Sequence, residues 1–138
     1  MIPDPPSALT PRILVTGRLR PEDIPGLAQS GVRSIVNHRP DHEEPDQATS
    51  AEIEAEATRH GLDYTHLPTV GMPGAEVVAG TAAVLNALGA DDTVLMFCKS
   101  GMRSTVAWAL ARRLAGEDPT VLRSSAMRAG YNLDAVPL

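Results

Sequence analysis

Apolar and polar residues alternate along the chain with two periodicities, one typical of strands and one typical of helices. Short apolar runs predict strands, and the segments between them have apolar residues at helical spacing. The expected strands are 12–17, 32–37, 62–68 and 92–97. The expected helical segments are 21–31, 50–61, 75–89, 104–116 and 118–130. This alternation predicts an α/β fold with a central, mainly parallel sheet flanked by helices.

Two of the expected helices have clear start signals. Thr49 and Glu52 have the spacing of a capping box, in which each side chain bonds to the backbone N–H of the other residue. Asp118 comes before Pro119, which suits the first position of a helix because its missing N–H is not needed there. Residues 1–11 contain four prolines and predict a flexible tail, followed by a single domain over 12–138.

Length and charge narrow the classes of function. A chain of 138 residues is long enough for one domain with its own core. Its net charge of −5 gives no general attraction to nucleic acid or to an anionic membrane. No apolar run is long enough to span a bilayer, the single cysteine cannot form an internal disulfide, and the first residues do not resemble a secretory signal. We therefore expect a cytoplasmic protein that binds neither nucleic acid nor membrane.

The only cysteine, Cys98, stands directly after the strand that is expected to be buried. Four residues separate it from Arg103, where a helical pattern begins; they are Lys99, Ser100, Gly101 and Met102. Backbone N–H groups of this loop and of the helix start, with Ser104 beside them, are expected to surround one anion. That anion is a bound oxyanion or the Cys98 thiolate itself. We predict that Cys98 and Arg103 are catalytic and that the other five residues bind the anion.

Several segments in order carry a resemblance to a known family. They are "VTGRLRPEDI", "GVRSIVNHRPDHEEPDQ", "GLDYTHLP", "CKSGMRS", "WALARRLAG" and "AGYNL". Together, from Thr16 to Leu133, they resemble the phosphatase-like domain of the beta-lactamase hydrolase-like proteins. The resemblance implies a compact cysteine-phosphatase-like fold and a metallo-hydrolase-like partner domain or protein. Arg18 stands where the family leads us to expect glutamine.

The resemblance adds two residues to the predicted site. Asn37 and Arg39 match the family's Asn-x-Arg-Pro segment, which implies that they help to bind an anionic substrate. They could equally cap and brace their loop, together with the acidic residues at 41, 43, 44 and 46. His38 and His42 do not make a convincing metal site, because no third ligand is nearby in the sequence. We expect no metal and no cofactor.

Three features differ from an ordinary cysteine phosphatase. Such enzymes generally have five residues between Cys and Arg, whereas the four found here are similar in number to those of rhodanese-type sulfurtransferases. The loop at 67–76 contains no Asp to act as general acid, and we expect its Glu76 to stabilise a helix start instead. Phe97 precedes the cysteine where phosphatases of this fold commonly have His.

These differences favour sulfur transfer through a persulfide on Cys98. The sulfur donor would be a persulfide or thiosulfate, and the acceptor an external thiol or protein, because the chain has no second cysteine. One alternative is a cysteine-dependent phosphatase that forms a phosphocysteine from a small phosphoester. The other is a non-catalytic module that binds anions.

Overall fold

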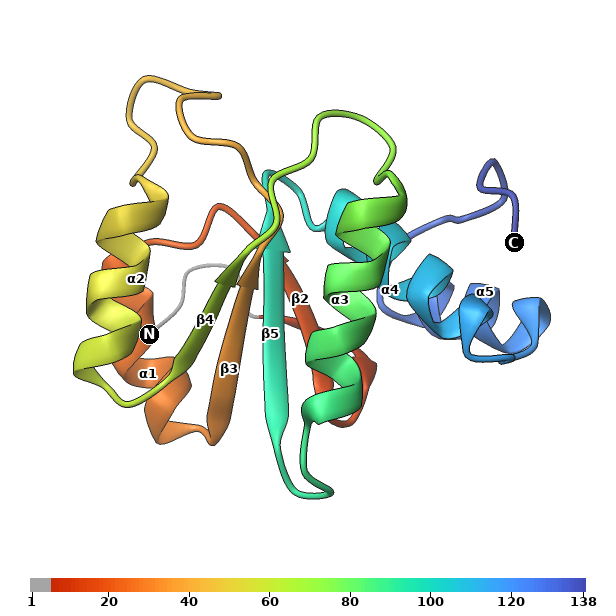
Figure 1. Ribbon diagram of the computed structural model, residues 1–138, viewed down its shortest axis with the longest axis horizontal. Helices are drawn as coiled ribbons and strands as arrows, with labels where there is room; N and C mark the ends of the chain where they lie inside the picture. The colour runs from red at the N-terminus through yellow and green to blue at the C-terminus, as the bar shows by residue number, and fades with distance from the viewer. Residues whose placement is uncertain (1–5) are drawn as a thin grey trace.

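The computed structural model describes residues 6–138, which form a five-stranded sheet with helices on both faces (Figure 1). The strands are β1 Ser7–Thr10, β2 Ile13–Gly17, β3 Val32–Asn37, β4 Asp63–His66 and β5 Thr93–Cys98. They lie in the order β1-β2-β5-β3-β4. β1 runs antiparallel to β2, and every other neighbouring pair is parallel. The prediction of an α/β fold with a mainly parallel sheet is confirmed.

The helices form a layer on each side of the sheet. They are a 3-10 helix Pro21–Asp23, α1 Ile24–Gln29, α2 Ser50–Arg59, α3 Ala75–Ala87, α4 Met102–Leu114 and α5 Pro119–Arg128. α1 and α2 cover one face, whereas α3 and α4 cover the other, with α5 packed against α4 (Figure 1). No helix within residues 6–138 has the length and apolar character needed to cross a membrane.

The sheet separates two hydrophobic cores, because successive side chains of a strand point to opposite faces. In β5, Val94 and Met96 belong to the core under α3, α4 and α5, whereas Leu95 and Phe97 belong to the core under α1 and α2. All four are buried, which explains the continuous apolar run in the sequence. Trp108 of α4 is 2% exposed in the first core, and its indole N–H has no hydrogen-bond partner among the described residues.

Both predicted helix starts are present. The Thr49 side chain accepts a hydrogen bond from the Glu52 N–H, and a Glu52 carboxylate oxygen accepts one from the Thr49 N–H at 2.9 Å. The Asp118 carboxylate accepts a hydrogen bond from the Thr120 N–H at 2.7 Å. These bonds satisfy backbone donors that have no partner inside the helix.

The structure differs from the prediction at the N-terminus. Residues 7–10 lie inside the expected tail of 1–11, yet they form the edge strand β1 along β2. Leu9 is buried in the core under α3, α4 and α5. This strand is too short for its pattern to stand out among the neighbouring prolines. Residues 1–5 of the predicted tail lie outside the described residues.

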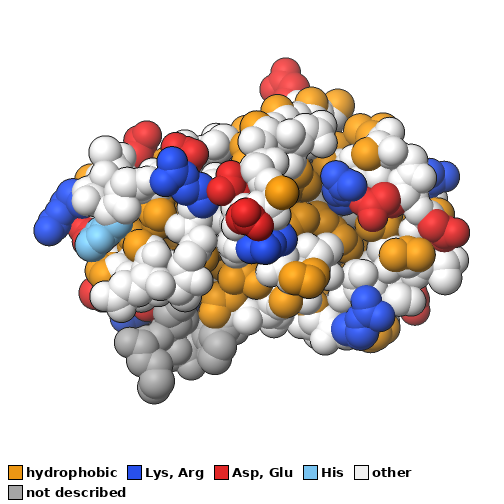
Figure 2. Space-filling view, turned by 90° about the horizontal axis from the view of Figure 1, so that it is seen from below, with side chains coloured by type: hydrophobic (Ala, Val, Ile, Leu, Met, Phe, Trp, Pro, Cys, Tyr) orange, Lys and Arg blue, Asp and Glu red, His pale blue; other side chains and the backbone are white. Residues whose placement is uncertain are grey.

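The parallel strands of the sheet all start at one end and finish at the other. Figure 2 shows the end from which the parallel strands start, where acidic and basic side chains are interspersed. At the opposite end the parallel strands finish, and the loops after β2, β3 and β5 meet there (Figure 1). Ligands of parallel α/β sheets bind at that carboxyl end, so a functional site is expected among these loops.

Candidate active site

Cys98 is the last residue of β5, a strand that pairs with β2 on one side and β3 on the other. After it, the chain turns through a short loop and enters α4 at Met102, two residues earlier than the pattern predicts. The turn depends on Gly101, whose φ of 95° lies in the left-handed region that favours glycine. We call residues 98–103 the Cys98 loop.

The Cys98 sulfur lies inside this loop. The Gly101 N–H donates a hydrogen bond to Sγ at 3.1 Å, and Cys98 has no exposed surface. The start of α4 adds the partial positive charge of a helix N-terminus. The loop therefore places a backbone donor and a helix N-terminus next to the sulfur.

Arg103 is held beside Cys98 by two loops from elsewhere in the chain. Its Nη1 and Nη2 each donate to a Glu43 carboxylate oxygen at 2.8 Å, and Nη1 also donates to the Thr69 carbonyl at 2.7 Å. The bond to Glu43 raises the pKa of Arg103, and the nearby Cys98 sulfur contributes less. Conversely, Arg103 lowers the pKa of Glu43, so this carboxylate is ionised at neutral pH.

These contacts leave one edge of Arg103 without an oxygen partner, and the Cys98 sulfur lies nearby. A guanidinium has five N–H donors, and the bonds to Glu43 and Thr69 use three of them. Within residues 6–138, no oxygen accepts from the Nε–H or from the second Nη2–H, which share one edge of the planar group. Such an edge matches two oxygens of a phosphate or a similar oxyanion. The site thus combines a buried sulfur with a two-donor edge for an anion.

An open hollow of about 570 Å³ lies over the Cys98 loop. It is lined by Ser7, Val15, Thr16, Gly17, Arg18, Lys99, Ser100, Arg103 and Tyr131. Three predicted site residues, Lys99, Ser100 and Arg103, are among them. Met102 instead packs against the core under α3, α4 and α5, and Ser104 is buried behind the loop.

Ser104 bonds to the buried His38. The Ser104 hydroxyl lies 2.8 Å from Nδ1 of His38, and the Thr81 hydroxyl lies 2.9 Å from Nε2. Because the Thr81 hydroxyl donates to a carbonyl of α3, it must accept from Nε2–H, and Nδ1 then accepts from Ser104. Burial, followed by the charge of Arg103, lowers the pKa of His38 to about 4. His38 is therefore neutral at pH 7, and its Nδ1 accepts a hydrogen bond from the Ser104 hydroxyl.

Asn37 and Arg39 lie near the site but do not line the hollow. Asn37 accepts a hydrogen bond from the Arg39 N–H at 2.7 Å and donates one to the Tyr64 hydroxyl at 3.0 Å. The Arg39 side chain is only 5% exposed and pairs with Glu43 and Glu44. These contacts brace the loop after β3, which is one of the two roles expected. Their role in anion binding stays a prediction.

Tyr131 reaches the Cys98 loop from the C-terminal segment, although the sequence does not predict it as a site residue. Its hydroxyl donates to the Ser100 carbonyl at 3.0 Å. A Cβ built at Gly101 would lie 2.1 Å from the same hydroxyl, so this contact also requires glycine. Tyr131 is 31 residues away from Ser100, and no local pattern links them. The only signal was its presence in the "AGYNL" segment of the resemblance.

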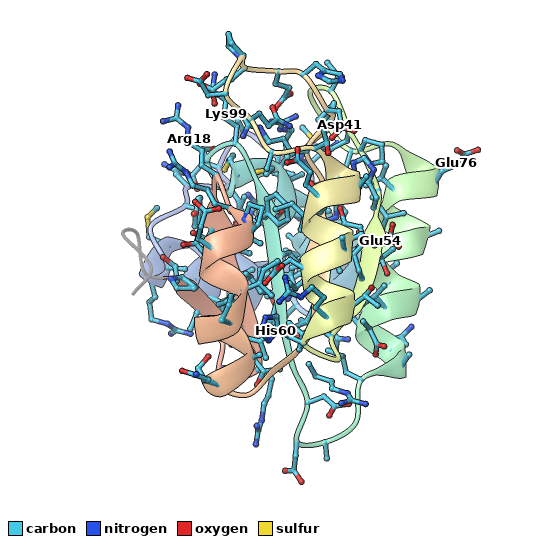
Figure 3. The ribbon with its side chains drawn as sticks, turned by 90° about the vertical axis from the view of Figure 1, so that its left-hand side faces the viewer. Arg18, Asp41, Glu54, His60, Glu76 and Lys99 are labelled. Atoms are coloured by element: carbon cyan, nitrogen blue, oxygen red, sulfur yellow. The ribbon has the colours of Figure 1, made fainter. Side chains whose placement is uncertain are left out.

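The described residues near the hollow offer no carboxyl group suited to donate a proton. Glu76 is exposed at the start of α3 and points away from Arg18 and Lys99 (Figure 3). Glu43 and Glu44 are closer, but Arg103 lowers the pKa of Glu43 and Arg39 lowers that of Glu44. Carboxylates that stay ionised at neutral pH are poor general acids.

Three of the four histidines, His38, His60 and His66, hydrogen-bond to other groups. His60 bonds to Glu56, and His66 bonds to the Arg39 carbonyl. In the part of the chain that the structure describes, no three His, Cys, Asp or Glu side chains gather in a way that could hold a metal ion. At the hollow the chain therefore offers the guanidinium of Arg103, the amine of Lys99 and the hydroxyl of Tyr131, with the Cys98 thiol buried in the adjoining loop.

Comparison with known structures shows a shared fold. A candidate phosphatase of Neisseria meningitidis aligns with a TM-score of 0.80 and 24% identity, over 94% of this chain and 91% of its own. A candidate phosphatase (DUF442) of Shewanella putrefaciens aligns with a TM-score of 0.75 and 22% identity, over 95% of this chain and 80% of its own. PTPMT1 aligns with a TM-score of 0.67 and 18% identity, over 92% and 86% of the two chains. The predicted cysteine-phosphatase-like fold is confirmed.

Comparison of sequences shows the family. The beta-lactamase hydrolase-like protein of Xylella fastidiosa is 35% identical over 107 residues, and that of Agrobacterium fabrum is 32% identical over the same length. Each match covers 76% of this chain but only 24% of the relative, so the chain spans about a quarter of these proteins. The family model for the phosphatase-like domain of the beta-lactamase hydrolase-like protein matches residues 7–115. This agrees with the prediction of a phosphatase-like enzyme domain, and the chain belongs to that family.

Proposed function

We propose that this domain is a cysteine-dependent phosphatase that forms a phosphocysteine on Cys98. The observation that carries the proposal is the open two-donor edge of Arg103 beside the sulfur. Two phosphoryl oxygens bind this edge while the thiolate attacks phosphorus, and the ester oxygen leaves with the electron pair of the broken P–O bond. Water then cleaves the P–S bond, which releases phosphate and restores the thiolate. The family and the fold support this reaction over the sulfur transfer that sequence alone favoured.

The site sets a limit on the substrate. A leaving oxygen that departs without a proton must be stable as an anion, since the carboxylates near the hollow are held ionised. Aryl phosphates meet this condition, whereas alkyl phosphates do not. We therefore expect rapid turnover of alkyl phosphates to be absent, and its detection would reveal a proton donor other than these carboxylates.

Sulfur transfer is a second candidate, and the four-residue spacing of the Cys98 loop favours it. The thiolate would attack the outer sulfur of thiosulfate or of a persulfide, and sulfite or a thiolate would leave with the electrons of the broken S–S bond. An external thiolate or cyanide would then take the sulfur from Cys98 and restore the thiolate. No proton has to reach a leaving oxygen in this reaction, which suits the lack of a general acid.

Either reaction requires movement at the Cys98 loop. The sulfur has no exposed surface, and the hollow ends at the residues that cover it. A substrate can reach Cys98 only if this loop or Arg103 shifts. Substrate-induced loop movements of this kind are common in enzymes.

The test compares the two reactions on the same protein. Release of nitrophenol from 4-nitrophenyl phosphate is measured beside formation of thiocyanate from thiosulfate and cyanide. Cys98→Ser should lower the phosphatase rate by about 10³-fold or more, and Arg103→Ala by about 10²-fold. Arg113→Ala, an exposed change in the last turn of the same helix α4, is the matched control and should leave the rate unchanged.

Mass spectrometry of the intact protein identifies the intermediate. A phosphocysteine adds about 80 Da and a persulfide about 32 Da. Turnover of thiosulfate with the smaller adduct, and none of aryl phosphate, would replace the proposal by sulfur transfer. Phosphate binding that Arg103→Ala weakens, without turnover or adduct, would instead identify a non-catalytic anion-binding module.

A further inference from the structure

The hollow over the Cys98 loop is positively charged although the chain carries a net charge of −5. Its charged lining residues are Arg18, Lys99 and Arg103, and no carboxylate is among the described residues that line it. In the proposed function, Arg103 binds the phosphoryl group that reacts with Cys98. Arg18 and Lys99 are two further cations on the same wall.

The backbone brings these two cations together. A Cβ built at Gly17 would lie 2.4 Å from the Lys99 carbonyl oxygen, so the loops after β2 and β5 are in direct contact. The Arg18 N–H donates to the Cys98 carbonyl at 2.9 Å. Arg18 and Lys99 lie at the same corner of the molecule, above the carboxyl ends of the strands (Figure 3).

Arg18 is held in an unfavourable backbone conformation. Its φ of 52° lies in the left-handed region, which is unfavourable for a residue with a side chain. This conformation places a long cationic side chain on the rim of the hollow, where glycine would fit the backbone better. Strain of this kind is often found at functional sites.

The charge of Arg18 is only loosely paired in the structure. Its Nε lies 3.4 Å from one Glu44 carboxylate oxygen, its Nη2 donates to the other at the long distance of 3.5 Å, and its side chain is 61% exposed. Glu44 bonds more closely to the buried Arg39, which is the largest cause of its lowered pKa; Arg18 and Lys99 contribute less. An exposed pair with this geometry adds little stability. A ligand anion can therefore replace Glu44 as the partner of Arg18 at small cost.

We propose that Arg18 and Lys99 form a second anion subsite, which binds a negatively charged group of the substrate away from the atom that reacts. This inference rests on the proposed function of Cys98, because Arg103 must bind the reacting group. The substrate class is then a small molecule with two separated anionic groups, one a phosphoryl ester and the other a phosphate or a carboxylate. A hollow of about 570 Å³ suits a small molecule of this kind.

The test uses three aryl phosphates that differ in one substituent. Phenyl phosphate has one anionic group, 4-carboxyphenyl phosphate adds a carboxylate, and 4-(phosphonomethyl)phenyl phosphate adds a phosphonate. We expect kcat/KM for at least one doubly charged substrate to exceed that for phenyl phosphate by about tenfold, less at high salt. The doubly charged substrate whose kcat/KM exceeds that of phenyl phosphate by the larger factor shows whether the second anionic group is a carboxylate or resembles a phosphate. Ratios near one for both substrates would overturn the subsite.

Variants test whether Arg18 and Lys99 cause the preference for a doubly charged substrate. Arg18→Gln and Lys99→Gln, alone and combined, should bring the ratio of doubly to singly charged substrate towards one. Arg20→Gln removes the same charge two residues further along, outside the lining of this hollow, and should keep the ratio. A preference that persists in the double variant would overturn the assignment.

Equilibrium binding separates this proposal from the proposed function. Calorimetry with Cys98→Ser protein measures the affinity for the same three compounds without turnover. Tighter binding of a doubly charged compound, lost in Arg18→Gln, supports the subsite even if the wild-type protein hydrolyses none of them. Turnover of phenyl phosphate, with no gain in affinity from a second charge, would retain the catalytic role of Cys98 and overturn the subsite.

Discussion

At the scale of single residues, His38 links burial to the effect of pH on stability. Its pKa of about 4 in the folded chain is lower than the ordinary value of 6.5, mainly because of burial. As pH falls below 6.5, the unfolded chain takes up a proton at this residue while the folded chain does not. Acid therefore favours the unfolded state over this range. The stability that depends on neutral His38 is fully lost near pH 4.

We predict that the free energy of unfolding falls by about 1 to 2 kcal/mol between about pH 7 and pH 5 because of His38. Urea denaturation at a series of pH values measures this fall. His38→Asn should be less stable at pH 7 but should show a flatter profile. Glu43 and Glu44 have lowered pKa values, so their contribution is lost only below about pH 4.5. Parallel profiles for the two proteins would contradict the prediction.

The two hydrogen bonds to Glu43 fix the orientation of Arg103. A substitution of Glu43 should therefore change activity although Glu43 does not contact the substrate. We predict that Glu43→Gln lowers kcat/KM for an aryl phosphate by about 10- to 100-fold, because the open edge of Arg103 loses its orientation. Glu44→Gln is the control, since Glu44 pairs with Arg39 and Arg18 but not with Arg103. Its effect should be several times smaller. Equal losses in the two variants would show that the loop acts as a whole.

At the scale of elements, the sequence predicts the central strands and the long helices well. β5 is a continuous apolar run because both its faces are buried, and α2 begins at a capping box that local spacing reveals. β1 is missed because four residues at the edge of a sheet carry too little pattern. Local sequence signals of this kind predict individual strands and helices, but they do not predict which elements lie side by side in the fold.

The candidate site is predicted only in part for the same reason. Cys98 and Arg103 are linked by a short spacing, so the sequence brings them together. The partners of Arg103 are Glu43, 60 residues away, and Thr69, 34 residues away. They meet because β5 lies beside β3, an order that the hydrophobic pattern does not show.

Contact between loops explains why glycine is required at two positions. We predict that Gly17→Ala and Gly101→Ala each lower stability by about 1 to 3 kcal/mol, because the added Cβ meets the Lys99 carbonyl or the Tyr131 hydroxyl. Gly26→Ala in α1 meets no atom within 4 Å and should instead stabilise the protein by up to about 1 kcal/mol. Thermal and urea denaturation of the three variants measure these changes. Similar effects in all three would contradict the argument from contact.

At the scale of the whole molecule, the C-terminal segment is part of both the core and the site. Leu133 and Val136 are buried with the side chains of α4 and α5, and Tyr131 reaches the Cys98 loop. Arg123 of α5 donates to the carbonyls of Leu133 and Val136, the latter at 2.9 Å. The Arg123 side chain therefore links the C-terminal segment to α5 by hydrogen bonds.

We predict that Arg123→Ala lowers the free energy of unfolding by about 1 to 3 kcal/mol, because two backbone acceptors lose a charged donor. It should also lower activity, since Tyr131 supports the Cys98 loop. Arg128→Ala is the control, because its recorded bond is a single one of 3.3 Å to Ser125 in the same helix. Urea denaturation and an aryl phosphate assay check both effects. Equal stability of the two variants would contradict this role of Arg123.

Trp108 is the only tryptophan of the chain, and it is enclosed in apolar surroundings where residues 6–138 provide no partner for its indole N–H. Its fluorescence should therefore be blue-shifted in the folded protein. It lies five residues after Arg103 on α4, about 7.5 Å along the helix axis. Emission from this one residue consequently reports on the helix that carries the anion-binding arginine. Stopped-flow fluorescence of this residue should therefore show whether substrate binding displaces α4, without any attached label.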